Sequence, residues 1–179
     1  VLLARSAEAF RAFVQREQIP CVSTLLGRDA LSHDDRLYFS WLGMHGMKYA
    51  NLAVQESDLI LALGIRFDDR ITGKLDTFAP KAQIIHVDID ASECEKNVPT
   101  RCFLHGDLKC FFDVFPETKT EENAVWRGKW GDRLNDLKAQ YPLKKPDFSQ
   151  FTEMVAIHTL DQLISRDAVI TTDVGQHQM

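Results

Sequence analysis

Glycines, a hydroxyl residue, acids and arginines follow four short apolar runs of the sequence, at the point where each run ends. They are Thr24, Gly64, Arg66, Asp68, Arg70, Asp88, Gly106 and Asp107. In an open parallel sheet, ligands bind in the crevice outside the carboxyl ends of the strands. A need for turns would explain the glycines at these positions, but it would not explain the acids and the arginines. The pattern therefore predicts a ligand site along one edge of a sheet.

The chemistry expected of this edge is recognition of a nucleotide. Asp88 ends the run 84–88, and an acid at that place accepts hydrogen bonds from ribose hydroxyl groups. Alternatively, its carboxylate caps the next helix, and Gly64 serves only as a turn that ends a strand. Both interpretations are open at the level of these residues.

Two arginines and a glycine-flanked segment extend the candidate site. Arg66 and Arg70 would bind a diphosphate through their multi-donor guanidinium groups; alternatively they form surface ion pairs with Asp68 and Asp69. Segment 43–46 precedes an expected helix, and its small residues would let a phosphate or a flat ring approach the backbone amides there. The histidine of this segment, taken alone, is more often a structural residue than a ligand.

Apolar runs alternate with amphipathic stretches, which is the pattern of an α/β domain with a parallel sheet. Short continuous apolar runs fit strands that are covered on both faces. The predicted strands are 19–24, 58–64, 84–88 and 102–104, and the predicted helices are 6–17, 47–55 and 108–115. The fingerprint G-x-G-x-x-G is absent, so a dinucleotide would be held in a non-standard Rossmann manner.

Residues 117–146 differ from the rest of the sequence and are interpreted as a linker. They are rich in charge and proline, and they include Trp126 and Trp130, which are expected to be exposed. The linker is expected to hold a helix at 124–140, and it is followed by a predicted helix at 149–165 and a predicted strand at 168–172. A domain boundary is therefore predicted near residue 146.

Composition and charge exclude several classes of protein. The 179 residues are 45% hydrophobic and 26% charged, and their formal net charge of −5 argues against a nucleic-acid surface. No apolar run approaches the about 20 residues that a membrane span needs, and residues 1–5 lack the features of a signal peptide. Cys21 and Cys102 lie in apolar runs and are expected to be reduced core residues.

Several longer motifs, which include most of the candidate nucleotide-binding residues, resemble those of a known protein family. The segments that carry this resemblance are 42–46 with 49–51, 64–74 and 174–179, supported by 86–90 and 106–107. In this order and spacing they closely resemble the catalytic subunit of the acetohydroxyacid synthase (acetolactate synthase) family of thiamine-diphosphate enzymes. The resemblance implies a Rossmann-like flavin-binding middle domain at 1–116, a linker at 117–146 and the start of a C-terminal thiamine-diphosphate-binding domain at 147–179. Both ends of the chain are expected to be truncations.

The resemblance also implies which residues bind cofactors. The implied contacts to flavin adenine dinucleotide (FAD) are Thr24, Leu25, Leu42, Gly43, Met44, His45, Gly64, Arg66, Asp68, Arg70, Asp88, Ile89, Gly106 and Asp107. The implied contacts to thiamine diphosphate are Val174, Gly175, Gln176 and His177. The catalytic glutamate of the family and its Mg²⁺-binding motif belong to other parts of the enzyme. The chain alone is therefore expected to be inactive, with no catalytic residue or metal ligand of its own.

The implied activity joins pyruvate to a second pyruvate or to 2-oxobutyrate with loss of carbon dioxide, as a step of branched-chain amino acid biosynthesis. A homodimer or tetramer with a small regulatory subunit is implied, without nucleic acid or membrane, in the bacterial cytoplasm or in a eukaryotic plastid or mitochondrion. Two alternatives are a glyoxylate carboligase or a pyruvate oxidase, which segment 66–74 opposes. A third is a non-catalytic nucleotide-binding module, which segment 174–179 opposes.

Overall fold

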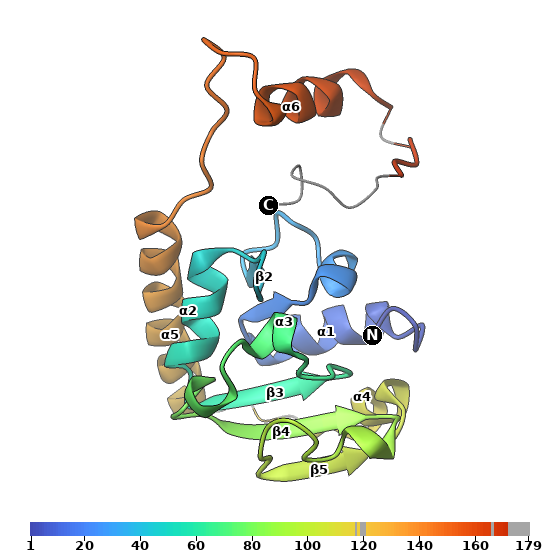
Figure 1. Cartoon of the computed structure of the whole chain (residues 1–179). Helices are drawn as coiled ribbons and strands as arrows, with labels where there is room; N and C mark the ends of the chain where they lie inside the picture. The colour runs from blue at the N-terminus through green and yellow to red at the C-terminus, as the bar shows by residue number, and fades with distance from the viewer. Residues whose placement is uncertain (117, 119–120, 166, 172–179) are drawn as a thin grey trace. The chain divides into compact units, whose positions relative to one another are not determined.

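A computed structural model describes residues 1–116, 118, 121–165 and 167–171, without the side chains of 121–124 and 126. The chain divides into two compact units, Val1–Tyr141 and Pro142–Met179 (Figure 1). All five strands of the described residues belong to the first unit. The predicted ligand site at the strand ends therefore lies within that unit.

The strands of the first unit form two parallel sheets. In one sheet, β1 (Cys21–Ser23) pairs with β2 (Tyr38–Trp41). In the other, β4 (Gln83–Asp88) is central and pairs with β3 (Leu59–Leu63) and β5 (Cys102–His105). Both pairings of the second sheet are parallel, so the ends of β3, β4 and β5 meet at one edge.

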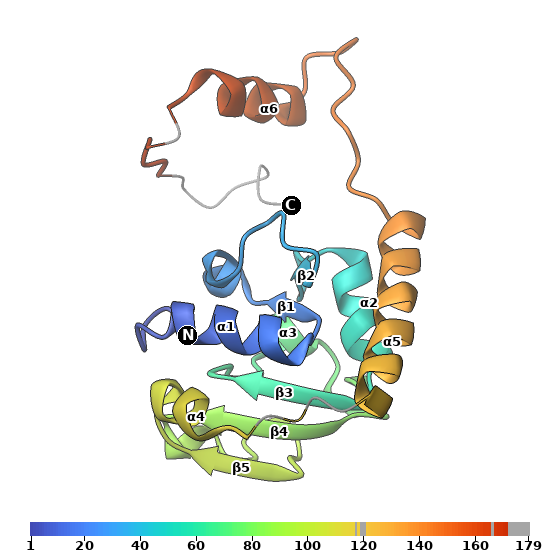
Figure 2. The same ribbon diagram turned by 180° about the vertical axis from the view of Figure 1, so that it is seen from behind.

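Helices pack on both faces of these strands. One core cluster joins α1 (Ala7–Glu17) and α4 (Leu108–Val114) to the sheets, and another joins α2 (Lys48–Glu56) and α5 (Glu121–Gln140) to them. Figure 2 shows α2 and α5 side by side, as Figure 1 does from the other direction. The short elements that complete the unit are η1 (Leu25–Ala30), α3 (Asp69–Thr72), η2 (Leu75–Thr77) and η3 (Ala91–Glu93).

Alternation along the strands explains why both faces are covered. On β1, Cys21 packs against the α1–α4 cluster, while Val22 packs against the α2–α5 cluster. On β3, Leu61 and Ile60 divide between the same two clusters. Successive side chains of a strand point to opposite faces, so a continuous apolar run supplies both. The predicted α/β class, with parallel strands covered by helices, is confirmed.

Several elements differ from the sequence predictions. Strand β2 was not predicted, because its four residues follow a polar segment and run directly into a glycine turn. Cys102 was expected in the core but is exposed, because β5 is the last strand of its sheet in the described residues. Trp130 was expected to be exposed, yet it is partly buried against the α2–α5 cluster.

Helix α5 lies within the stretch that was interpreted as a linker. Its side chains Leu134 and Leu137 are only 2% and 1% exposed, and they pack against α2. The three-residue spacing places both leucines on one face of the helix. This helix therefore belongs to the first compact unit, which extends to Tyr141.

The second unit contains one described helix, α6 (Glu153–Leu163), close to the predicted range 149–165. Its first turn is capped by Thr152, whose hydroxyl accepts a hydrogen bond from the Val155 N–H at 3.4 Å. The strand predicted at 168–172 is not formed at 168–171, and residue 172 lies outside the described residues. A strand requires a hydrogen-bonded neighbour, and no strand of the described residues pairs with this segment.

Candidate functional site

At the end of β2, the chain turns through a glycine that hydrogen bonds hold in place. The Gly43 N–H donates to Asn51 Oδ1 at 2.8 Å, and Asn51 Nδ2 donates back to the Gly43 carbonyl at 3.0 Å. Gly43 has a φ of 104°, a conformation that favours glycine. A Cβ atom at this position would lie 2.7 Å from the Arg70 carbonyl oxygen. The turn after β2 is therefore held by contacts of the Gly43 backbone, which leave no room for a side chain at this position.

The same turn connects the end of β2 with the segment that follows β3. The Met44 N–H donates to the Arg70 carbonyl at 2.7 Å. Its neighbour His45 is exposed, and the His45 carbonyl accepts a hydrogen bond from Trp41 Nε1 at 3.0 Å. Two segments that are remote in sequence thus meet where the resemblance implies flavin contacts.

The segment after β3 carries the arginines and acids of the longest motif. Arg66 is 73% exposed in its side chain and lies 3.6 Å from Asp68, Nη2 to Oδ2, so the predicted ion pair is present. Asp68 also caps α3, because its Oδ1 accepts the Ile71 N–H at 3.2 Å. Arg70 is exposed. Both guanidinium groups are accessible to a ligand, while Asp68 has a structural task as well.

The ends of β3, β4 and β5 form a continuous backbone ladder. The Gly64 N–H donates to the Val87 carbonyl at 2.8 Å, and the Gly106 N–H donates to the Asp88 carbonyl at 2.9 Å. Two glycines therefore flank the end of the central strand. A Cβ atom on Gly106 would meet no atom within 4 Å, which leaves open space beside Asp88.

The alternative interpretation of Asp88, in which its carboxylate caps the next helix, does not hold. Asp88 Oδ1 accepts the Asp90 N–H at 2.9 Å, and it is Asp90 that caps the short helix η3. Asp88 is 8% exposed at the carboxyl end of β4. Asp107, in contrast, caps α4 by accepting the Lys109 N–H at 2.7 Å. Of these acids, Asp88 is the one best placed to accept a ligand hydroxyl.

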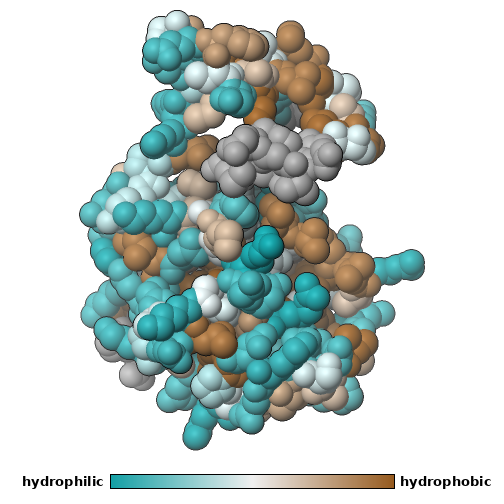
Figure 3. Space-filling model, in the orientation of Figure 1, coloured by the Kyte–Doolittle hydropathy of each residue, from teal (hydrophilic) through white to brown (hydrophobic). Residues whose placement is uncertain are grey.

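The remaining predicted contacts are apolar or partly buried. Thr24 is partly buried at the end of β1, and Leu42 is 7% exposed at the end of β2. Leu25, Met44 and Ile89 are instead 54%, 65% and 68% exposed. In the space-filling view, hydrophobic residues are interspersed with hydrophilic ones over the visible face (Figure 3). Exposed apolar side chains next to strand ends fit a ligand with a flat apolar ring.

Fourteen of the predicted cofactor contacts thus lie in the described residues, at the ends of the five strands or in the segments that follow them. Three links join them: the β1–β2 pairing, the Met44–Arg70 hydrogen bond and the ladder across β3, β4 and β5. The four predicted thiamine-diphosphate contacts, Val174, Gly175, Gln176 and His177, lie outside the described residues.

Two residues that the sequence analysis did not assign to the site are part of its support. Asn51 fixes both backbone groups of Gly43 from helix α2. His86 is 1% exposed on β4, and neither of its ring nitrogens has a hydrogen-bond partner in the described structure. Both residues stand in segments that had been recognised as motifs, but only the folded chain shows what they touch.

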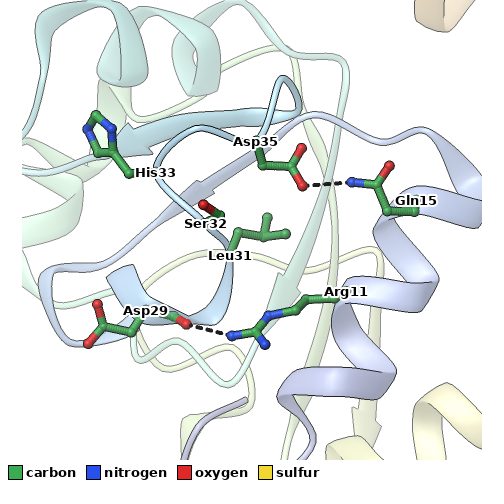
Figure 4. A pocket seen from close by; sticks show the side chains of 7 residues that line it. All are labelled: Arg11, Gln15, Asp29, Leu31, Ser32, His33 and Asp35. Carbon is green, nitrogen blue, oxygen red and sulfur yellow. Dashed lines mark hydrogen bonds between the residues drawn. The ribbon is translucent and has the colours of Figure 1, made fainter.

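A separate surface hollow lies between α1 and the loop before β2 (Figure 4). Its volume is about 480 Å³, and its lining residues are Arg11, Gln15, Asp29, Leu31, Ser32, His33 and Asp35. Arg11 donates to the carbonyls of Ala30 and Asp29, and Gln15 donates to Asp35 at 2.7 Å. These polar groups already tie α1 to the loop, so the hollow is interpreted as structural.

Metal and thiol chemistry receive no support from the described part of the chain. It contains no group of three or more His, Cys, Asp or Glu side chains that could hold a metal ion. All four cysteines are free. Burial of the Cys21 thiol, aided by the charge of Asp35, raises its pKa to about 12, so it stays protonated at neutral pH. No helix among the described residues is long and apolar enough to cross a membrane.

Fold and candidate site together define a class of protein: an α/β domain with parallel strands, whose strand ends carry glycine backbone, an acid and exposed arginines. Comparison with known families agrees with this class. Residues 1–115 match the family described as "Thiamine pyrophosphate enzyme, central domain". The chain belongs to this family of thiamine pyrophosphate enzymes.

Individual relatives extend the similarity along almost the whole chain. The chain is 42% identical to acetolactate synthase 1, chloroplastic, of Zea mays and 43% identical to the chloroplastic acetolactate synthase of Arabidopsis thaliana, over 98% and 97% of its length. It is 42% identical over 96% of its length to the acetolactate synthase large subunit of Parasynechococcus marenigrum. It spans 27–28% of the length of these relatives.

Proposed function

We propose that this chain is a segment of an acetolactate synthase large subunit. The parent enzyme would condense pyruvate with a second pyruvate, or with 2-oxobutyrate, and release carbon dioxide. The observation that carries the proposal is identity of 42–43% to acetolactate synthases across 96–98% of the chain. That similarity continues beyond residue 115, where the match to the family model ends.

The task proposed for the first unit is to bind FAD along the strand ends. Exposed guanidinium groups at Arg66 and Arg70 suit a diphosphate. Asp88 Oδ2 accepts no hydrogen bond among the described residues, so it has lone pairs for a ribose hydroxyl, and the position of a Cβ atom on Gly106 is open at the same strand end. The glycine turn at Gly43 lets the Arg70 backbone approach closely, which holds the segment with both arginines beside the end of β2. These features support the proposal of a dinucleotide site.

The task proposed for the end of the second unit is to contribute to a thiamine-diphosphate site. Val174, Gly175, Gln176 and His177 carry this part of the proposal through the family resemblance. Bound thiamine diphosphate would supply the electron sink for decarboxylation and carbon–carbon bond formation. Mg²⁺, the catalytic glutamate and most of the binding site would come from other parts of the parent.

The proposal extends to the assembly and location of the parent. A homodimer or tetramer with a small regulatory subunit would act on the 2-oxo acids. The cyanobacterial relative favours a bacterial cytoplasm, and the chloroplastic relatives favour a plastid.

The decisive experiment is an assay of the full-length parent. The purified parent, supplied with thiamine diphosphate, Mg²⁺ and FAD, should form acetolactate from pyruvate, and it should release FAD when it is denatured. The 179-residue chain alone should form none under the same conditions. A parent that oxidises pyruvate without forming acetolactate, or that contains no flavin, would overturn the proposal.

A further inference from the structure

His86 and Asp88 form a buried pair at the end of the central strand β4. Their spacing of two residues places both side chains on the same face of the strand. The His86 ring lies edge-on between Phe67 and Phe103, with ring centroids 5.2 Å away on each side. His86 Nε2 lies 3.7 Å from Asp88 Oδ2.

A buried imidazole between two phenylalanine rings is unusual unless one of its nitrogens forms a hydrogen bond. Buried polar groups in folded proteins nearly always have hydrogen-bond partners, but neither nitrogen of His86 has one in the described structure. A phenylalanine would fill the space between two aromatic rings without an unpaired donor. The acid that faces Nε2 is therefore the natural partner, at a distance just beyond a hydrogen bond.

The two oxygens of Asp88 are held differently. Oδ1 accepts the Asp90 N–H at 2.9 Å, which fixes that side of the carboxylate to the backbone. Oδ2 lies 3.7 Å from His86 Nε2 and accepts no hydrogen bond from any of the described residues. A small rotation of either side chain would close this contact and fix the second oxygen as well.

We propose that His86 is a positioning residue for Asp88 in dinucleotide binding. Its Nε2–H holds Asp88 Oδ2, so that the remaining lone pairs of the carboxylate face the crevice and accept the ribose hydroxyls of FAD. This inference rests on the proposed function and adds to it a residue that would not touch the ligand.

The test compares three forms of the full-length parent: the wild type, His86→Phe and His86→Gln. Flavin fluorescence gives the dissociation constants for FAD and for an FAD analogue whose ribose lacks both hydroxyls. His86→Phe should weaken FAD binding about tenfold, the effect of one hydrogen bond to a charged group. It should leave binding of the analogue unchanged. His86→Gln, which keeps an N–H donor, should recover most of the affinity for FAD.

A second comparison shows whether His86 acts through Asp88. In an Asp88→Asn background, His86→Phe should cause little further loss of FAD affinity, because coupled residues are not additive. His86→Phe should keep a single cooperative thermal transition, which separates a loss of FAD affinity from a loss of the fold. If His86→Phe does not fold, His86→Leu removes the same donor and takes its place.

Equal losses for FAD and for the analogue, or full additivity with Asp88→Asn, would overturn the role of His86 and leave it a packing residue. A wild-type parent that does not bind FAD would instead overturn the proposed function. The two failures are therefore distinguishable.

Discussion

The first unit buries three acids, Glu17, Asp88 and Glu93, and the surroundings of Glu17 and Asp88 differ. Glu17, at the end of α1, has no exposed side-chain surface, and both its carboxylate oxygens have partners in Arg16 and Thr118. Asp88 faces an imidazole whose nitrogens have no partner, and it borders open space beside Gly106. A buried acid with every oxygen partnered belongs to the scaffold. A buried acid with unpartnered neighbours at a strand end marks the place where a ligand is expected.

Glu17 also shows how the scaffold holds its most charged helix. Arg127, on α5, donates to the Glu17 carbonyl at 2.5 Å and to the Thr118 hydroxyl at 2.9 Å. Its Nη2 lies 3.7 Å from Glu17 Oε2. The cluster therefore ties the end of α1 to α5 through Glu17 and Arg127, which are 110 residues apart in sequence.

The largest expected effect is a loss of folding stability in the variant Glu17→Ala. The substitution leaves Thr118 without its buried acceptor and Arg127 without its ion-pair partner, which should lower the free energy of unfolding by about 3 kcal/mol. Urea denaturation of the chain measures this change. The matched control is Glu56→Ala, which removes the exposed pair of Glu56 with Arg133 between α2 and α5 and should cost less than about 1 kcal/mol. Similar losses in the two variants would contradict the distinction between a buried scaffold cluster and a surface pair.

A smaller effect is expected at the two glycines of the site. Gly43→Ala should cost about 2 kcal/mol of stability, because the residue has a positive φ and its Cβ would lie 2.7 Å from a backbone carbonyl. Gly106→Ala should leave stability nearly unchanged, since its Cβ meets nothing within 4 Å. In the parent, Gly106→Ala should instead weaken FAD binding by filling the space beside Asp88. A stability loss for Gly106→Ala equal to that for Gly43→Ala would show that this space is not open.

The variant Arg66→Ala tests the candidate ligand site, in contrast to the scaffold cluster at Glu17. The exposed guanidinium of Arg66 is expected to contact the FAD diphosphate, so its loss in the parent should weaken FAD affinity about tenfold to hundredfold. Turnover at saturating FAD should change much less. Arg101→Ala, which removes an exposed positive charge just before β5, at the opposite edge of the sheet, is the control and should leave FAD affinity unchanged. An unchanged FAD dissociation constant with collapsed turnover would place Arg66 on the substrate instead.

Local patterns predicted most of the fold. The apolar runs at 58–64 and 84–88 became β3 and β4, and the helical spacing at 6–17 became α1. The predicted site residues of the first unit also fell at strand ends, because parallel strands necessarily bring those ends to one edge.

The features that escaped prediction depend on partners far away in sequence. In the sequence alone, Glu17 resembles an ordinary surface acid, because its contact with Arg127 of α5 forms only in the folded chain. His86 reads as part of a strand until Phe67 and Phe103 enclose it. The packing of α5 was missed because two leucines, Leu134 and Leu137, are a weak signal in a helix that is rich in charged residues.

The smallest expected effect is the pH dependence that Glu17 imposes on stability. Burial raises the pKa of Glu17, but hydrogen bonds from Thr118 and Arg16 and the charge of Arg16 outweigh it and hold the pKa below its ordinary value of 4.5. A carboxylate with a depressed pKa in the folded state stabilises fully above its unfolded pKa. That stability is lost as the pH falls through the folded pKa. The unfolding free energy of the wild type should therefore decline below about pH 4.5.

Glu17→Gln removes this titration while keeping a side chain of the same shape. The difference in unfolding free energy between the wild type and Glu17→Gln should be constant above about pH 5 and should shrink below about pH 4.5. Glu56→Gln should show the same direction with a smaller amplitude, because the hydrogen bond from Arg133 lowers the pKa of an exposed group. Urea titrations at each pH measure all three proteins. A difference for Glu17→Gln that stays constant, or grows, as the pH falls would mean that the folded cluster does not prefer the ionised acid, and the contrast with Asp88 would lose its electrostatic basis.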